Sequence, residues 1–147
     1  RMPESMLPFA EQIGVNAPMI LFNGALIYDN LPKALSALFG LGVGEWAVIH
    51  CPEGGFGMDQ DGKLYSCGQI GLPKDKIMGK VGAGDAFCAG MLCAAHRGMN
   101  LGDALLLANC AATMSLTEPG ATEAMGTVEE ALKYAEIYGV ADSGAAF

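Results

Sequence analysis

The chain has 147 residues, enough to bury one proper hydrophobic core, and a formal net charge of −8. This acidic balance argues against nucleic acid and anionic membranes as partners, because both would repel the chain. Its five cysteines include no C-x-x-C pair, which favours reduced, buried thiols over a disulfide framework or a zinc site. With no apolar run of membrane-spanning length and no signal peptide, the sequence predicts a cytoplasmic protein without a metal site.

Helical and strand-like patterns alternate along the chain, which predicts an α/β layered sheet. The expected elements, in chain order, are helix 4–13, strand 18–23, helix 31–40, strand 46–51, hairpin strands near 56–59 and 63–67, and helices 83–97, 101–116 and 127–137. The Asp61-Gly62 pair provides the turn of the hairpin. The tail, residues 141–147, is small and polar enough to fray.

Capping residues mark the starts of the last two helices. Asn100, three residues before Asp103, is a candidate N-cap for helix 101–116, and Thr127 with Glu130 forms a capping box for helix 127–137. Helix 83–97 is apolar nearly all round, so we expect it to be sandwiched between other layers.

The glycine-rich stretch Gly82-Ala83-Gly84-Asp85 leads directly into helix 83–97. Backbone N–H groups at such a helix start point at one spot, and the helix dipole adds partial positive charge, so the loop predicts an anion site. A carboxylate among anion-binding donors suits phosphoryl transfer, which needs a base for the attacking hydroxyl and donors for the transferred oxygens. The alternative for so short a motif is structural, because Asp is a common N-cap and glycine is common before helices.

A longer resemblance extends the motif. Residues 82–98, 101–105, 108–112 and 119–121 follow the order and approximate spacing of the C-terminal part of the PfkB (ribokinase-like) carbohydrate kinases, which the chain resembles from about Lys33 to Tyr138. The resemblance implies a ribokinase-like layered αβα sheet, of which this chain would hold the C-terminal portion only. It also implies ATP and Mg²⁺ as cosubstrate and cofactor, and a sugar or nucleoside as the acceptor.

The same resemblance implies the roles of individual residues. Gly82, Ala83 and Gly84 would form the anion hole for the γ-phosphate, and Asp85 would be the catalytic base that takes the proton from the acceptor hydroxyl. A carboxylate at a helix N-terminus stays ionised and is a weak base, which suffices for a loose phosphoryl-transfer transition state.

Nucleotide-binding residues outside the loop also come from the resemblance. The candidates are His50 at the end of strand 46–51, Glu53 and Gly55 just after it, and Asn109 and Gly120 beside the adenine pocket. His50 takes the Thr place of the family's Thr-x-Gly-x-x-Gly turn, and Gly55 keeps its second Gly. The structural alternatives are a hydrogen-bonded strand-end His50 and an interior Asn109 bonded to a neighbouring carbonyl.

The chain departs from the family pattern at two places. The family usually has Asp-Thr before the glycine loop, where this chain has Gly79-Lys80, so the family's monovalent-cation site is in question. Lys80 could place its ammonium near the phosphates, or be a solvated loop lysine. The family's Asn-x-x-Glu element, which helps to organise magnesium, is not found.

The first thirty residues do not resemble the kinase family. Residues 22–29 instead resemble the Asn-Gly-Ala segment of Cof-type haloacid-dehalogenase (HAD) phosphatases, but the Asp-x-Asp nucleophile motif of those enzymes is absent. We therefore expect residues 1–30 to be a HAD-like fragment or a divergent segment, residues 31–140 the kinase portion, and residues 141–147 a flexible tail. The expected function is ATP-dependent phosphorylation of a sugar or nucleoside hydroxyl, incomplete without a missing N-terminal half or a homo-oligomer. The alternatives are a non-catalytic nucleotide-binding remnant and a fusion with a HAD-type phosphatase piece.

Overall fold

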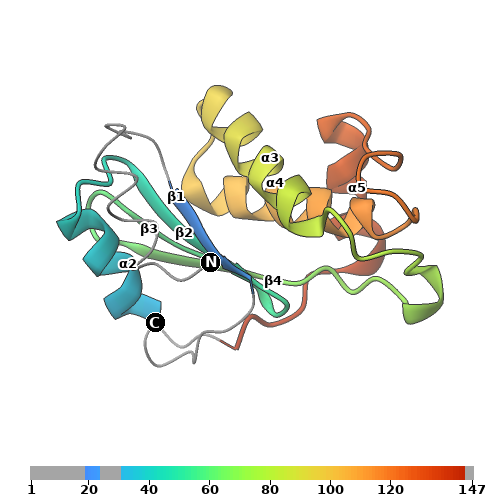
Figure 1. Ribbon diagram of the computed structural model, residues 1–147, viewed down its shortest axis with the longest axis horizontal. Coiled ribbons are helices and arrows are strands. Elements are labelled where there is room, and N and C mark those ends of the chain that lie inside the picture. The colour runs from blue at the N-terminus through green and yellow to red at the C-terminus, as the bar shows by residue number, and fades with distance from the viewer. Residues whose placement is uncertain (1–18, 24–30, 145–147) are drawn as a thin grey trace.

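The computed structural model describes the backbone of residues 19–23 and the whole of residues 31–144. Within these residues the strands form one sheet in the order β1-β2-β3-β4 (Figure 1). The strands are β1 (Met19–Asn23), β2 (Trp46–Cys51), β3 (Gly54–Asp59) and β4 (Leu64–Gly68). β1 and β2 run parallel, whereas β2, β3 and β4 form an antiparallel meander.

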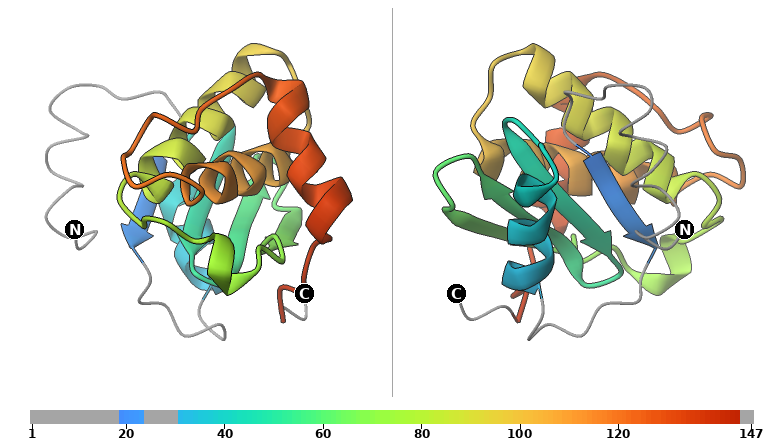
Figure 2. Two further views of the ribbon diagram at one scale, coloured as in Figure 1. Left: turned by 90° about the vertical axis from the view of Figure 1, so that its right-hand side faces the viewer. Right: turned by 60° about the vertical axis from the view of Figure 1, so that its left-hand side comes forward.

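Helices cover both faces of this sheet. The helical elements are α2 (Leu31–Gly40), a short 3₁₀ turn (Lys74–Lys76), α3 (Ala83–His96), α4 (Leu101–Ser115) and α5 (Val128–Tyr138). α2 lies on one face, while α3, α4 and α5 form the layer on the other face (Figure 1 and Figure 2). The predicted αβα layering is therefore confirmed.

The two faces of the sheet bury two separate hydrophobic cores, because successive side chains of a strand point to opposite faces. Ala47 and Ile49 of β2 pack in the core beneath α2, whereas Val48 packs in the core beneath α3 and α4. In β3, Phe56 and Met58 belong to the α2 core. Glycines occupy the alternate positions of β3, which face the other layer.

These glycines let the helical layer approach the sheet closely. A Cβ atom at Gly55 would lie 2.9 Å from the ring of Phe87 in α3 and 3.0 Å from Leu105 in α4. α3 and α4 also pack closely on each other, because a Cβ atom at Gly90 would lie 2.7 Å from the Cα atom of Ala108. The start of α3 is thereby fixed relative to β2 and β3.

The element boundaries agree closely with the predicted ones. α2 and β2 span the predicted residues, and every other predicted element within the described residues differs by at most two residues at either end. The N–H of Asp103 donates to Asn100 Oδ1 at 3.0 Å, and Thr127 and Glu130 form the predicted capping box. The predicted helix 4–13 lies outside the described residues, and the 3₁₀ turn was not predicted.

The prediction that α3 is sandwiched is wrong. Phe87 and Met91 are buried on its inner face, but Leu92 is 56% exposed because α3 lies in the outer layer with solvent beyond it. The predicted burial of the cysteines holds only for Cys110; all five are free thiols and the other four are half-buried. Among the described residues, no helix has the length and apolarity to cross a membrane.

Candidate functional site

The glycine-rich loop lies at the carboxyl end of the parallel strand pair. His50, near the end of β2, stacks on Phe87 of α3 with ring centroids 4.1 Å apart and ring planes 11° from parallel. Phe87 lies in the first turns of α3, so the N-terminus of this helix is at the end of β2. In open α/β sheets, ligands bind in the crevice outside the carboxyl ends of the strands.

A left-handed backbone conformation at Gly82 shapes the loop. Gly82 is the N-cap of α3 with φ 86° and ψ −6°, a conformation that glycine adopts at little cost. A Cβ atom there would lie 2.6 Å from the Cβ atom of Ala121, and one at Gly79 would lie 2.8 Å from the carbonyl oxygen of Pro119. The structure thus brings the loop against the distant Pro119-Gly120-Ala121 turn.

The N-terminus of α3 lacks the side-chain cap that α4 and α5 have. Asn100 caps α4 and Thr127 caps α5, whereas no side chain of the described residues caps α3. The first intrahelical bond, from the N–H of Ala86 to the Gly82 carbonyl, measures 2.8 Å. The N–H groups of residues 82–84 have no acceptor among the described residues. A helix start with unpaired donors and a positive dipole end can hold an anion.

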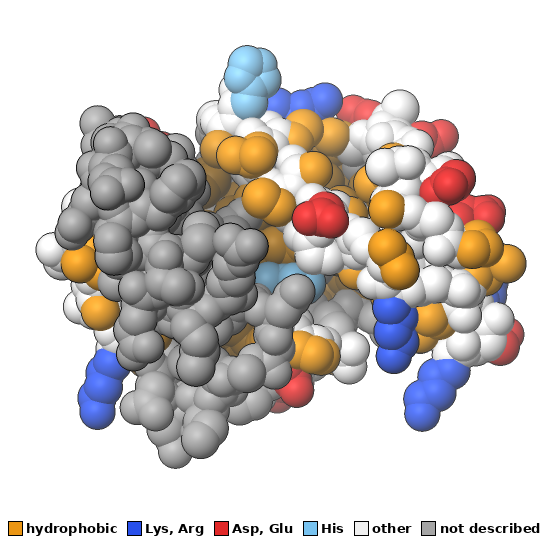
Figure 3. Space-filling model, in the orientation of Figure 1, with side chains coloured by type: hydrophobic (Ala, Val, Ile, Leu, Met, Phe, Trp, Pro, Cys, Tyr) orange, Lys and Arg blue, Asp and Glu red, His pale blue; other side chains and the backbone are white. Residues whose placement is uncertain are grey.

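Asp85 lies in the first turn of α3 with its side chain exposed. It is not the N-cap, so the structural alternative in which Asp85 caps the helix is wrong. No described residue donates a hydrogen bond to its carboxylate, which leaves the oxygens available to an external proton donor. Two hydrophobic side chains, Met78 at 62% and Val81 at 69% exposure, precede the loop, and hydrophobic side chains are spread over the helical layer (Figure 3).

His50 and Glu53 border the same end of the sheet. The His50 ring is half-buried against Phe87, and this burial lowers the pKa of His50 from its ordinary value of 6.5. Its ring is therefore neutral at pH 7. Glu53 is exposed in the turn between β2 and β3, where its carbonyl accepts from the N–H of Gln69 at 2.9 Å.

The remaining predicted residues are closer to the interior. Asn109 is 3% exposed, and its Nδ2 donates to the carbonyls of Cys67 at 2.9 Å and Gly68 at 3.3 Å. This is the carbonyl-bonded arrangement that the sequence left open. Gly55 is buried beneath Phe87, and the carboxylate of Glu123 occupies the space that a side chain at Gly120 would need.

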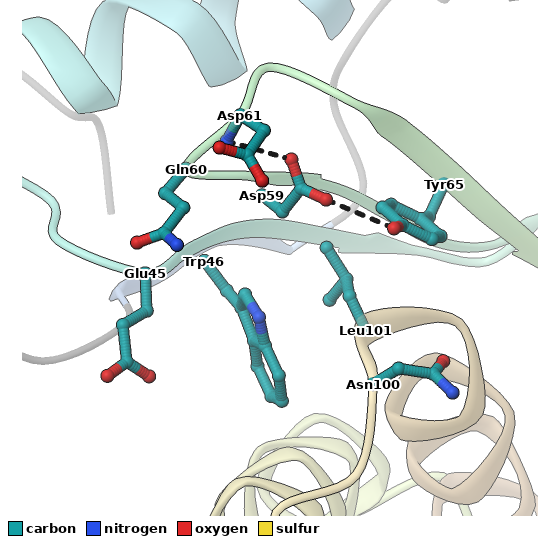
Figure 4. A pocket seen from close by; sticks show the side chains of 8 residues that line it. All are labelled: Glu45, Trp46, Asp59, Gln60, Asp61, Tyr65, Asn100 and Leu101. Carbon is teal, nitrogen blue, oxygen red and sulfur yellow. Dashed lines mark hydrogen bonds between the residues drawn. The ribbon is translucent and has the colours of Figure 1, made fainter.

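A cavity of about 300 Å³ lies at the opposite end of the hairpin (Figure 4). Its lining residues are Glu45, Trp46, Asp59, Gln60, Asp61, Tyr65, Asn100 and Leu101. Trp46 pairs with Asp59 at one end of the β2–β3 ladder, and Cys51 pairs with Gly54 at the end near the loop. Sequence reasoning did not predict this cavity, because its walls come from the hairpin and the start of α4. This cavity and the predicted loop chemistry therefore do not coincide.

The sequence profile of the family described as pfkB family carbohydrate kinase matches residues 26–128. The chain therefore belongs to the pfkB family, as its motifs indicated. No curated protein matches the chain.

Solved structures share the fold. The chain is similar to 2-dehydro-3-deoxygluconokinase from Thermotoga maritima at 19% identity and a TM-score of 0.72, over 90% of this chain and 45% of that one. It is similar to Arabidopsis thaliana ribokinase complexed with ribose and ATP at 23% identity and a TM-score of 0.63, over 74% and 34%. A third likeness is to a putative Ribokinase II from E. coli in complex with ATP and Mg²⁺, at 15% identity and a TM-score of 0.67, over 93% and 47%. The fold is ribokinase-like, and the chain spans less than half the length of each of these structures.

Proposed function

We propose that this chain carries the phosphate-binding loop and the base of a PfkB-type kinase, which transfers the γ-phosphoryl group of ATP to a hydroxyl of a sugar or nucleoside. One observation carries the proposal. α3 begins at a left-handed Gly82 with an exposed carboxylate in its first turn, and no described residue caps it or pairs with its first N–H groups.

The loop residues Gly82, Ala83 and Gly84 would hold the γ-phosphate oxygens through their backbone N–H groups. Charge spreads over these oxygens in the transition state, so fixed donors at a helix N-terminus stabilise it. Asp85 would accept the proton of the attacking hydroxyl. A loose transition state needs only a weak base in the right place.

The other predicted residues take supporting places in this proposal. His50 and Glu53 border the phosphates, and Gly120 backs the loop from the opposing turn. Gly55 and Asn109 act from beneath, since Gly55 makes room for Phe87 and Asn109 ties α4 to the end of β4. Residues 31–140 form the kinase portion in this proposal, and residues 1–30 a HAD-like or divergent segment. A homo-oligomer or an N-terminal half supplies the sugar contacts, in the cytoplasm.

ATP and magnesium fit the described residues differently. The uncapped start of α3 and the left-handed Gly82 suit a phosphate group. No group of three or more His, Cys, Asp or Glu side chains within the described residues is placed to hold a metal ion. Magnesium is usually held by one or two carboxylates together with the phosphates of a nucleotide, so in this proposal it would enter the site with ATP.

ATP binding tests the proposal directly. Calorimetric titration of Mg²⁺-ATP should show binding that Gly84→Val removes, because the added side chain lies where the phosphate approaches the backbone. Gly102→Val is the matched control, since Gly102 occupies in α4 the position, two residues after the N-cap, that Gly84 occupies in α3. Unchanged affinity in Gly84→Val would contradict the proposal.

A second candidate, a nucleotide-binding remnant without catalysis, would use the same helix start, because the uncapped α3 and the left-handed Gly82 can hold a phosphate whether or not an acceptor is bound. A panel of sugars and nucleosides with ATP and Mg²⁺ separates the two functions. Phosphorylation of an acceptor supports the kinase, and ATP binding without any phosphorylated acceptor supports the remnant.

A further inference from the structure

The stack of His50 on Phe87 joins the two parts of the proposed site. His50 belongs to β2, whose backbone is paired on both sides, with Asn23 of β1 and with Gly55 of β3. Its ring is therefore carried by an inner strand of the sheet. Phe87 belongs to α3 and follows Asp85 by two residues, so its ring is attached to the same first turns as the loop donors and the carboxylate.

The Phe87 ring is fully buried, with Gly55 of β3 and the ring of His50 among its neighbours. It is 0% exposed, and the missing side chain of Gly55 leaves the space that the ring fills, 2.9 Å from where a Cβ atom would lie. The His50 ring covers another side of it at 4.1 Å in a nearly parallel stack. Loss of the His50 ring would therefore uncover one face of Phe87 and weaken the packing that holds the start of α3.

We propose that His50 is a positioning residue, which fixes the first turn of α3 by stacking on Phe87 and does not act by donating to a phosphate. The flat ring holds residues 82–84 and Asp85 at the carboxyl end of β2. Oriented donors stabilise a transition state only when they are fixed before the reaction, so this contact serves phosphoryl transfer directly. The role rests on the proposed function, but the contact and its effect on α3 can be measured without a nucleotide.

The state of the His50 ring is consistent with this role. Burial lowers its pKa, so the ring that stacks on Phe87 at pH 7 is neutral. A neutral ring has one N–H donor, whereas a phosphate-binding histidine gains from a positive charge. A flat ring without nitrogen atoms should therefore replace His50, and a small side chain should not.

Two substitutions of the same residue separate stacking from hydrogen bonding. His50→Phe keeps a flat ring and removes both nitrogen atoms, and His50→Ala removes the ring. Backbone hydrogen exchange of residues 86–88 should be about three- to tenfold faster in His50→Ala, the scale of an aromatic pair, and unchanged in His50→Phe. ATP affinity should follow the same pattern. His96→Ala is the control, because His96 is exposed at the far end of α3.

The outcomes distinguish the inference from the proposed function. Equal loss in His50→Phe and His50→Ala, or exchange unaffected by His50→Ala, would overturn the positioning role. If the wild-type protein binds no ATP, but exchange is faster in His50→Ala and unchanged in His50→Phe, the proposed function is overturned and the positioning of α3 by His50 is supported. If His50→Ala does not fold, His50→Leu fills the volume without a flat ring and should show the same faster exchange.

Discussion

The two ends of the β2–β3 ladder carry carboxylates in contrasting settings. At the cavity end, Asp59 Oδ1 accepts from the N–H groups of Asp61 at 3.0 Å and Lys63 at 2.9 Å, and Oδ2 accepts from the Tyr65 hydroxyl at 3.0 Å (Figure 4). At the loop end, Asp85 is exposed and accepts no hydrogen bond from a described residue. The hairpin uses its carboxylate to hold a turn, whereas α3 leaves both its carboxylate and its backbone donors available.

This contrast shows that a hollow is a poor guide to chemistry in this molecule. The cavity is concave and acidic, but the oxygens of Asp59 already have their partners. The loop combines a helix dipole with donors and a carboxylate that have no hydrogen-bond partner among the described residues. The following variants test whether function is confined to the loop end.

Asp85→Asn should have the largest effect. Loss of a general base lowers turnover by about 100-fold or more, while ATP affinity stays the same or rises because a negative charge leaves the anion site. Steady-state phosphoryl transfer and calorimetry measure the two quantities. Asp61→Asn, an exposed carboxylate at the cavity end, is the control and should change neither. Near-wild-type turnover in Asp85→Asn would exclude Asp85 as the base.

The next largest effect is expected on the free energy of unfolding in Gly82→Ala, with Gly62→Ala as the matched comparison. Both glycines have positive φ, 86° and 77°, so both substitutions incur backbone strain of about 1 kcal/mol. Only Gly82 also meets a neighbour, the Cβ atom of Ala121 at 2.6 Å, whereas nothing lies within 4 Å of a Cβ atom at Gly62. Urea unfolding should show a loss of about 2–4 kcal/mol for Gly82→Ala and about 1 kcal/mol for Gly62→Ala.

The same pair separates binding from stability. Gly82→Ala should weaken ATP binding and Gly62→Ala should not, because Gly62 lies in the hairpin turn at the cavity end. If both variants lose affinity equally, the loss reflects general destabilisation, and the loop has no special part in binding.

Asp59→Ala should act at the cavity end alone. It removes the acceptor of three hydrogen bonds in a partly exposed turn, and we expect the free energy of unfolding to fall by about 1–2 kcal/mol without a change in ATP affinity. Asp59→Asn keeps one acceptor oxygen and should recover part of the loss. A change in ATP affinity comparable to that of Gly82→Ala would mean that the two ends are coupled.

Local patterns in the sequence predicted the elements and the loop, because helix periodicity, caps and turn residues act over a few positions. Asn100 and Thr127 predicted the starts of α4 and α5, and both residues cap these helices in the structure. The close approach of Gly82 and Ala121 was not predicted, since nothing local links the two segments.

Other features could not be predicted because they depend on tertiary packing. Asn109 donates hydrogen bonds to carbonyls of β4 that lie far from it in the sequence. Without these partners, the sequence left open whether Asn109 contacts a nucleotide or a neighbouring carbonyl. The exposure of Leu92 depends on which layer α3 joins, which its apolar sequence does not specify. The stack of His50 on Phe87 likewise depends on how α3 docks on the sheet.

The smallest expected effect is a pH dependence of stability that originates at His50. Burial lowers the pKa of His50 in the folded protein below its ordinary value of 6.5. As the pH falls, the unfolded chain therefore binds a proton at His50 before the folded protein does. Stability therefore falls as the pH decreases through 6.5 and is fully present above it, since stability rises with pH wherever the unfolded state binds more protons. His50→Phe removes this group but keeps the stack, so its free energy of unfolding should improve relative to wild type between about pH 7.5 and about pH 5.5, before the carboxylates titrate. Urea unfolding at several pH values, with His96→Ala in parallel, measures the difference. A wild-type-like pH dependence in His50→Phe would mean that another group causes the acid sensitivity, and that the His50 ring is better solvated than its stack on Phe87 implies.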